Sequence, residues 1–214
     1  MSTWTDMVLI LLILTDFSLL GSSRLGACIR FVAFQGVLLG ALTLAAHEET
    51  VSLRPVILAI VSVGLKGAAF PWLLVRALRE ANVRHEIEPF VGYNLSLLMG
   101  AVVLVASLWL SSRLPLPTPP VSPFLVPVAL FTSFIGLFLI VSRKKALTQV
   151  LGYLVLENGI YAFGVGTVQN TPMLVELGVL LDVFVAVFVM GIAVFHISRQ
   201  FDHIDTDQLA VLKD

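Results

Sequence analysis

The run FLVPVALFTSFIGLFLIVSRKK, residues 124–145, decides the class of fold. Residues 124–142 contain no charged side chain, and Arg143, Lys144 and Lys145 follow directly. A helix needs about 20 apolar residues to cross the hydrocarbon core of a bilayer, and positive residues commonly flank its cytoplasmic end. The run therefore predicts a transmembrane helix whose carboxyl end faces the cytoplasm.

The composition of the whole chain agrees with this prediction. Charged residues make up 13% of the chain and apolar residues 58%, and the mean hydropathy is +0.98. A soluble domain has about 25% charged residues, so we predict an all-α integral membrane protein in contact with lipid. The net charge of −1 offers no basic surface to nucleic acid, and the single Cys28 excludes a disulfide framework and a thiolate metal site. Phosphate-binding and dinucleotide glycine motifs are absent from the sequence, so we predict no cofactor, no metal and no catalytic residue.

Apolar runs of membrane-spanning length recur along the chain, and they predict about seven transmembrane helices. Thr15, Asp16 and Ser18 interrupt the first of them, which makes it the weakest prediction. The predicted spans are residues 5–23, 29–46, 55–76, 90–110, 124–142, 146–167 and 173–195.

The distribution of positive residues predicts the orientation. Of the 13 Lys and Arg residues, Lys66 lies inside a span and Arg54 and Arg113 fall on one side, which leaves ten on the other side. Positive residues gather on the cytoplasmic side of membrane proteins. We therefore predict an amino terminus outside and a cytoplasmic carboxyl terminus. The ten are Arg24, Arg30, Arg76, Arg79, Arg84, Arg143, Lys144, Lys145, Arg199 and Lys213.

A cluster of prolines divides the chain. We expect residues 115–127 to form a stiff outer loop that is not helical until after Pro127. Alternatively, this segment is the boundary between two helical units. The chain would then consist of a four-helix unit over residues 1–114, a three-helix unit over residues 128–198 and a polar cytoplasmic tail over residues 199–214.

Three ionisable residues fall deep inside the predicted spans. Lys66, Glu157 and Asp182 each lie roughly 14–16 Å from the outer end of their helix, at 1.5 Å per residue. A charge at the centre of a bilayer costs about 2.5–3.5 kcal/mol on insertion scales, and such residues mark ion pathways or face a polar partner. A single carboxyl could be a structural contact, but the matched depth of three groups favours a proton or ion path. In an isolated chain, we expect Lys66 or an acid to face lipid, so that the protein needs its partners.

Further candidate residues accompany these three. Tyr153 and Tyr161 flank Glu157 at a spacing of four residues, on one face of the helix, where their phenols could hydrogen-bond the carboxyl or hold a water. Glu176 falls in the first turns of the last predicted span. It is either a helix-start charge or an outer member of the path.

At these residues the sequence resembles a known family. The run Leu151-Gly152-Tyr153-Leu154-Val155-Leu156-Glu157-Asn158-Gly159, with Leu174-Val175-Glu176-Leu177-Gly178, Asp182 and Val189-Met190, is similar to the E subunit of hydrogenase-4. That subunit belongs to the membrane-bound nickel–iron hydrogenases of the formate hydrogenlyase type. The last three spans also resemble the K subunit of respiratory complex I. Two buried glutamates of that subunit belong to a proton path. Glu157 corresponds to the first, and Asp182, a shorter acid, stands at the second.

The resemblance implies a non-catalytic subunit of the cell inner membrane. Its partners would be antiporter-like and core membrane subunits of a hydrogenase complex, and it would contribute Glu157, Asp182 and Lys66 to ion translocation coupled to electron transfer. Lys66 could instead neutralise a carboxylate on a partner subunit. Two other classes stay open: a structural adaptor whose acids have no proton role, and a free-standing transporter of a small solute.

Overall fold

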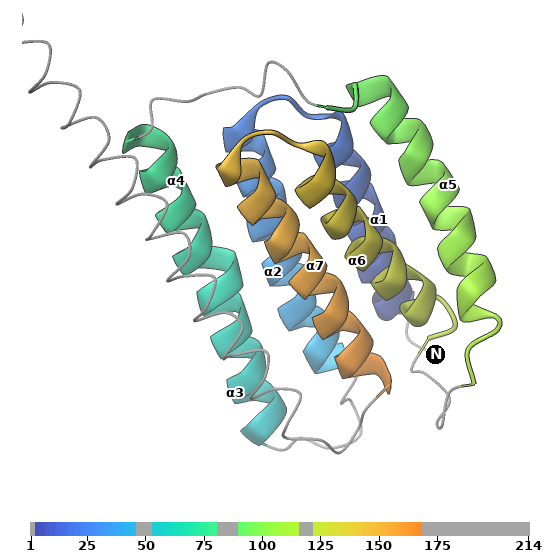
Figure 1. Cartoon of the computed structure of the whole chain (residues 1–214). Coiled ribbons are helices and arrows are strands. Elements are labelled where there is room, and N and C mark those ends of the chain that lie inside the picture. The colour runs from blue at the N-terminus through green and yellow to red at the C-terminus, as the bar shows by residue number, and fades with distance from the viewer. Residues whose placement is uncertain (1–2, 46–52, 81–89, 116–121, 168–214) are drawn as a thin grey trace, which may run out of the picture.

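The computed structural model describes residues 3–45, 53–80, 90–115 and 122–167, and its elements in these ranges are helices that run side by side as a bundle (Figure 1). One long helical segment, residues 53–80, consists of three consecutive elements, and the central one is a π-helix. The elements are α1 (Thr3–Gly21), α2 (Leu25–Ala45), α3 (Leu53–Ser62), η1 (Val63–Ala69), α4 (Phe70–Glu80), α5 (Tyr93–Ser111), α6 (Leu125–Ser142) and α7 (Ala146–Thr167).

The first six predicted spans coincide with these helices to within a few residues, with α3, η1 and α4 together covering the predicted span 55–76. Four of the described helices, α1, α2, α5 and α6, are long and apolar enough to cross a membrane. Despite Asp16, α1 is one continuous helix. The predicted span 173–195 and the predicted tail 199–214 lie outside the described residues.

The predicted end of the proline-rich loop is wrong. Helix α6 begins at Leu125, so Pro127 lies in its first turn and not before it. The first backbone N–H groups of a helix have no acceptor within that helix, so proline is tolerated there at no loss of a hydrogen bond. The loop therefore ends before Leu125.

Helices from both sides of the proline-rich segment share one core. A single buried cluster contains Leu20 of α1, Val32 of α2 and Phe70 of α4 together with Ile135 of α6 and Val155 of α7. In Figure 1, α6 and α7 stand in the middle of the view and in front of α1 and α2, with α3 and α4 at one edge and α5 at the other.

Glycines bring α6 and α7 into close contact. A Cβ atom added at Gly136 of α6 would collide with the backbone of Leu156, and one added at Gly159 of α7 would collide with Ser133. Small residues allow this approach of helix backbones, which is the usual basis of helix packing in membranes. Glu157 and Asn158 lie between Leu156 and Gly159 in the sequence. They therefore belong to the part of α7 that packs closely against α6.

Candidate functional site

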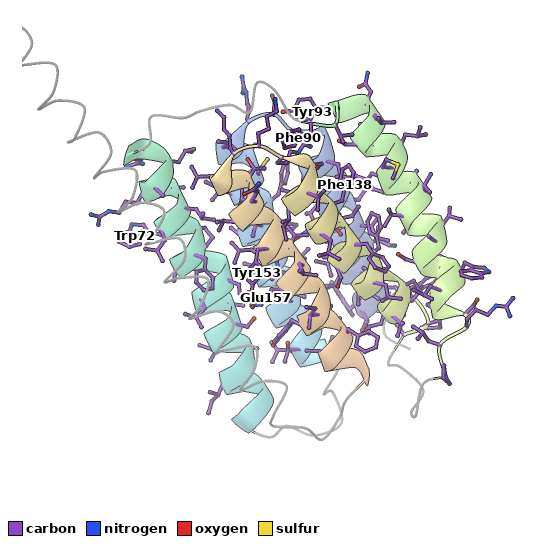
Figure 2. The ribbon with its side chains drawn as sticks, in the orientation of Figure 1. Trp72, Phe90, Tyr93, Phe138, Tyr153 and Glu157 are labelled. Carbon is purple, nitrogen blue, oxygen red and sulfur yellow. The ribbon has the colours of Figure 1, made fainter. Side chains whose placement is uncertain are left out.

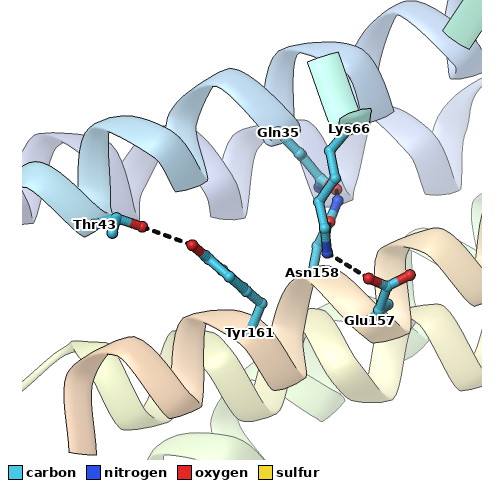
Figure 3. A network of polar contacts seen from close by, with 6 residues as sticks. All are labelled: Gln35, Thr43, Lys66, Glu157, Asn158 and Tyr161. Atoms are coloured by element: carbon cyan, nitrogen blue, oxygen red, sulfur yellow. Dashed lines mark hydrogen bonds and ion pairs between the residues drawn. The ribbon is translucent and has the colours of Figure 1, made fainter. Parts of the chain in front are cut away.

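Lys66 of η1 and Glu157 of α7 form a buried ion pair at the centre of the bundle. Lys66 Nζ donates a hydrogen bond to Glu157 Oε1 over 2.6 Å, and the two side chains are 5% and 3% exposed. Figure 2 shows Glu157 on the side of α7 that faces α3 and α4, and Figure 3 shows the contact itself. Two of the three residues that the sequence predicts at matched depth therefore meet within one chain, 91 positions apart. In the isolated chain Lys66 faces Glu157 and not lipid, whereas the third residue, Asp182, lies outside the described residues.

The local structure of η1 explains how Lys66 reaches this position. A π-helical turn contains an extra residue, which turns the following side chains relative to an α-helix, and such turns are frequent at functional sites. On the facing helix α2, a Cβ atom added at Gly36 would lie 2.6 Å from the carbonyl carbon of Lys66. A Cβ atom at Gly40 would collide with the side chain of Val63. The two glycines form a groove on α2 that receives η1, and this groove sets the distance from Lys66 to α7.

Replacement of Gly36 should therefore displace Lys66. We expect Gly36→Val to destabilise the protein by about 1–3 kcal/mol, the usual effect of overpacking, because the methyl groups collide with the backbone of Lys66 and Gly67. Gly64→Ala is the matched control in η1 itself, where an added Cβ atom meets nothing within 4 Å. Thermal unfolding of the two variants in the same detergent compares them. Equal melting temperatures would show that the groove on α2 does not position η1.

Asn158 extends the site from Lys66 to α2. Lys66 Nζ lies 3.5 Å from Asn158 Oδ1, and Asn158 Nδ2 donates to Gln35 Oε1 over 3.2 Å. Both amide side chains are buried, at 2% and 0% exposure. Figure 3 shows Gln35 and Asn158 beside the ion pair, each reaching from its own helix into the space between α2 and α7.

Asp16 of α1 forms the other end of this network. Gln35 Nε2 donates to Asp16 Oδ1 over 2.7 Å and to Thr15 Oγ1 over 3.0 Å. Thr132 of α6 donates to Asp16 Oδ2 over 2.7 Å. One hydrogen-bonded layer thus connects α1, α2, η1, α6 and α7. The sequence predicts Asp16 only as an interruption of the first span, although an acid in an apolar run is the same signal that marks Glu157.

The tyrosines predicted beside Glu157 take different places. The hydroxyl of Tyr161 hydrogen-bonds Thr43 Oγ1 over 3.0 Å, and the centre of its ring lies 5.1 Å from Lys66 Nζ (Figure 3). A cation over a phenol ring gains electrostatic stabilisation, so Tyr161 supports the ion pair through its ring. Tyr153 lies one turn away and packs against the hydrophobic core (Figure 2). Glu176 and Asp182 lie outside the described residues.

A second buried cation, Arg143, lies near one end of the bundle. Its side chain is 1% exposed, its Nη2 donates to Leu20 O over 3.0 Å, and its guanidinium lies 4.7 Å from the ring centre of Tyr93. Leu20 belongs to the last turn of α1, where backbone carbonyls have no partner within the helix and a cation is favourable. Arg143 thus ties the end of α1 to α5 and to the α6–α7 connection.

Comparisons with known proteins identify relatives of this chain. Residues 124–214 match the family of NADH-ubiquinone/plastoquinone oxidoreductase chain 4L. The chain is 32% identical to the protein Rv0085 of Mycobacterium tuberculosis over 204 residues, which cover 95% of this chain and 93% of that one. It is 27% identical to hydrogenase-4 component E of Escherichia coli over 143 residues, 67% of this chain and 66% of that one. No solved structure gives a significant match.

The helical bundle and the match to chain 4L define a membrane subunit of the complex I-like class. Within that class, the chain belongs to the family of Rv0085 and hydrogenase-4 component E. The matched region 124–214 contains Glu157 and Asn158, whereas Asp16, Gln35 and Lys66 precede it. The glutamate of the chain 4L-like part is therefore held by residues from the amino-terminal half.

Proposed function

We propose that this chain is a non-catalytic membrane subunit of a complex I-like nickel–iron hydrogenase of the formate hydrogenlyase type. In this role, it supplies the Lys66–Glu157 pair to an ion path that is coupled to electron transfer. The similarity to hydrogenase-4 component E supports the kind of complex, and the match to chain 4L supports the place in a membrane arm. The observation that carries the proposal is the ion pair of 2.6 Å in the interior of the bundle.

The chemistry of the pair suits ion translocation. Burial in an apolar medium disfavours both charged forms, while the contact between the two groups favours both. The proposal requires both a charged and a neutral form of this pair, and moving one proton from the ammonium to the carboxylate removes both charges at once. A charge that moves close to the pair, on an adjacent subunit or along the path, then shifts the equilibrium between the charged and the neutral form.

Asp182 and Glu176 complete this proposal. Both belong to the region that matches chain 4L, and we propose Asp182 as the next acid of the path and Glu176 as a group towards its outer end. Antiporter-like and core membrane subunits would flank the chain in the cell inner membrane. The proposed orientation has the amino terminus outside and the carboxyl terminus in the cytoplasm.

A structural adaptor is the second candidate, and one observation favours it. The Lys66–Glu157 pair and its amide neighbours hydrogen-bond one another within the chain, so the layer could serve only to fix how the helices pack. The two candidates differ in whether Glu157 changes its charge during turnover.

Glu157→Gln tests that difference. The amide keeps the shape and can still accept a hydrogen bond from Lys66, but it cannot bind or release a proton. We expect translocation per electron to fall on the order of 10²-fold, the usual effect of removing a positioned proton-transfer group, while the complex still assembles. The measurement is hydrogen evolution and ion uptake in inverted membrane vesicles, with the abundance of the complex checked on a native gel.

The matched control is Asp6→Asn. This variant also removes one carboxylate, but near the start of α1, where Asp6 accepts a hydrogen bond from Ser122, and it should leave translocation unchanged. An assembled Glu157→Gln complex that couples like the wild type would favour the adaptor.

A further inference from the structure

Asp16 is a buried acid that the proposed ion path does not use. Its side chain is 0% exposed, and its hydrogen-bond partners in the described part of the chain are Gln35 and Thr132. Neither partner carries a charge. A buried carboxylate with only neutral donors is far less stable than one with a cation beside it, so Asp16 is a candidate for a group that binds a proton.

The hydrogen bonds from Lys66 to Asp16 have only one possible direction. An ammonium group can only donate, so Asn158 presents Oδ1 to Lys66 and its Nδ2 to Gln35. Gln35 therefore receives this bond on Oε1 and donates from Nε2 to Asp16. The two carboxamide dipoles point the same way, and aligned hydrogen bonds polarise one another. A positive charge on Lys66 thus stabilises a negative charge on Asp16.

Thr132 lets Asp16 exist in either state. An ionised Asp16 accepts the hydrogen bond from the Thr132 hydroxyl, over 2.7 Å. A hydroxyl group can also accept, with its hydrogen turned elsewhere. A protonated Asp16 can then donate from Oδ2 to Thr132 Oγ1 at the same distance, and the bond from Gln35 remains. Neither state leaves an oxygen of Asp16 unsatisfied.

We propose that Asp16 is a second proton-binding site, coupled with opposite sign to Glu157 through Lys66, Asn158 and Gln35. The inference deepens the proposed function and rests on Glu157 taking up protons there. When the carboxylate of Glu157 gains a proton from the path, and not from Lys66, the ammonium keeps its charge without that counter-charge, and its effect on Asp16 increases. Asp16 then releases its own proton to water and becomes a carboxylate. When Glu157 loses its proton, Asp16 binds one.

The other helices around Asp16 contribute few competing charges. Helix α2 carries Arg30, which is exposed, and Cys28, while α6 carries no ionisable residue. Helix α5 carries only Tyr93. Arg143 contacts the last turn of α1 at Leu20, and Asp6 lies near the first turn of the same helix. Among the residues that the structure describes, Lys66 and Glu157 are the ionisable side chains that the amide network connects to Asp16, and the ring of Tyr161 lies near Lys66.

Infrared difference spectroscopy of the assembled complex tests this coupling. A pH step produces a carbonyl band for each carboxylic acid that gains or loses a proton, and the band absent from Asp16→Asn belongs to Asp16. In Glu157→Gln the protonated-to-ionised ratio of Asp16 at a fixed pH should fall on the order of tenfold, because Glu157 no longer opposes the charge of Lys66. In the double variant Lys66→Met, Glu157→Gln this fall should disappear. Asp6→Asn is the matched control and should leave the Asp16 band unchanged.

Three results would overturn the inference: no band that depends on Asp16 at any pH at which the complex is assembled, an Asp16 band unchanged by Glu157→Gln, or a fall that persists without Lys66. These results are separate from the test of the proposed function. If the Glu157→Gln complex stops translocating but its Asp16 band is unchanged, the proposed ion path is supported and the coupling to Asp16 is refuted. If it translocates normally while the protonated-to-ionised ratio of Asp16 falls, the coupling is supported and the ion path is refuted.

Discussion

Lys66→Met should destabilise the protein by about 3–5 kcal/mol, the effect expected when one partner of a buried ion pair is removed. The methionine fills most of the space of the lysine stem but leaves Glu157, 3% exposed, without the ammonium that lies 2.6 Å from it. The amide of Asn158 also loses the contact at its Oδ1. Unfolding of the purified complex in increasing denaturant, followed by the release of this chain, measures the loss.

Arg113→Met is the matched control for the loss of a cation. Arg113 is exposed and lies 5.8 Å from the ring centre of Trp109, at the end of α5. Surface substitutions of this kind change stability by less than about 0.5 kcal/mol. If Lys66→Met lowers the stability of the protein no more than Arg113→Met does, the ion pair does not hold η1 against α7.

Arg143→Ala should produce the second large loss, about 2–4 kcal/mol. Arg143 is 1% exposed, so its removal leaves a cavity, and the carbonyl of Leu20 loses the donor that lies 3.0 Å away. The ring of Tyr93 also loses its cation. The same unfolding measurement applies, and protease sensitivity at the α6–α7 connection should rise with it.

Arg24→Ala is the control for this position. Arg24 also belongs to the positive set predicted at the cytoplasmic side, but it is exposed, so its loss should leave stability nearly unchanged. Equal effects of the two substitutions would mean that Arg143 acts only as a surface charge and does not tie α1 to α5.

The positions of the helices could be predicted from the sequence because a membrane helix follows from the length and composition of one run. The matched depth of Lys66 and Glu157 could be predicted as well, since it depends only on the number of residues from a helix end. The contact between their side chains agrees with that prediction.

The side that each residue faces could not be predicted in the same way. Lys66 points to Glu157 because η1 is a π-helix and because Gly36 lets it approach α2, and neither fact follows from the periodicity of a single span. Tyr161 shares a stripe with Glu157, as predicted, yet its hydroxyl bonds Thr43 on another helix. The role of Asp16 could not be predicted, because its partners Gln35 and Thr132 are uncharged side chains on two other helices.

We propose that the Lys66–Glu157 pair belongs to an ion path and is not only a structural contact. The double variant Lys66→Met, Glu157→Met separates the two roles, because replacing a buried ion pair by apolar side chains of similar volume is usually neutral or stabilising for the fold. The decisive measurement is the number of ions moved per electron by this variant in vesicles, with the amount of assembled complex determined on the same sample. We expect normal assembly and translocation lower on the order of 10²-fold. Normal assembly with wild-type translocation would contradict this proposal.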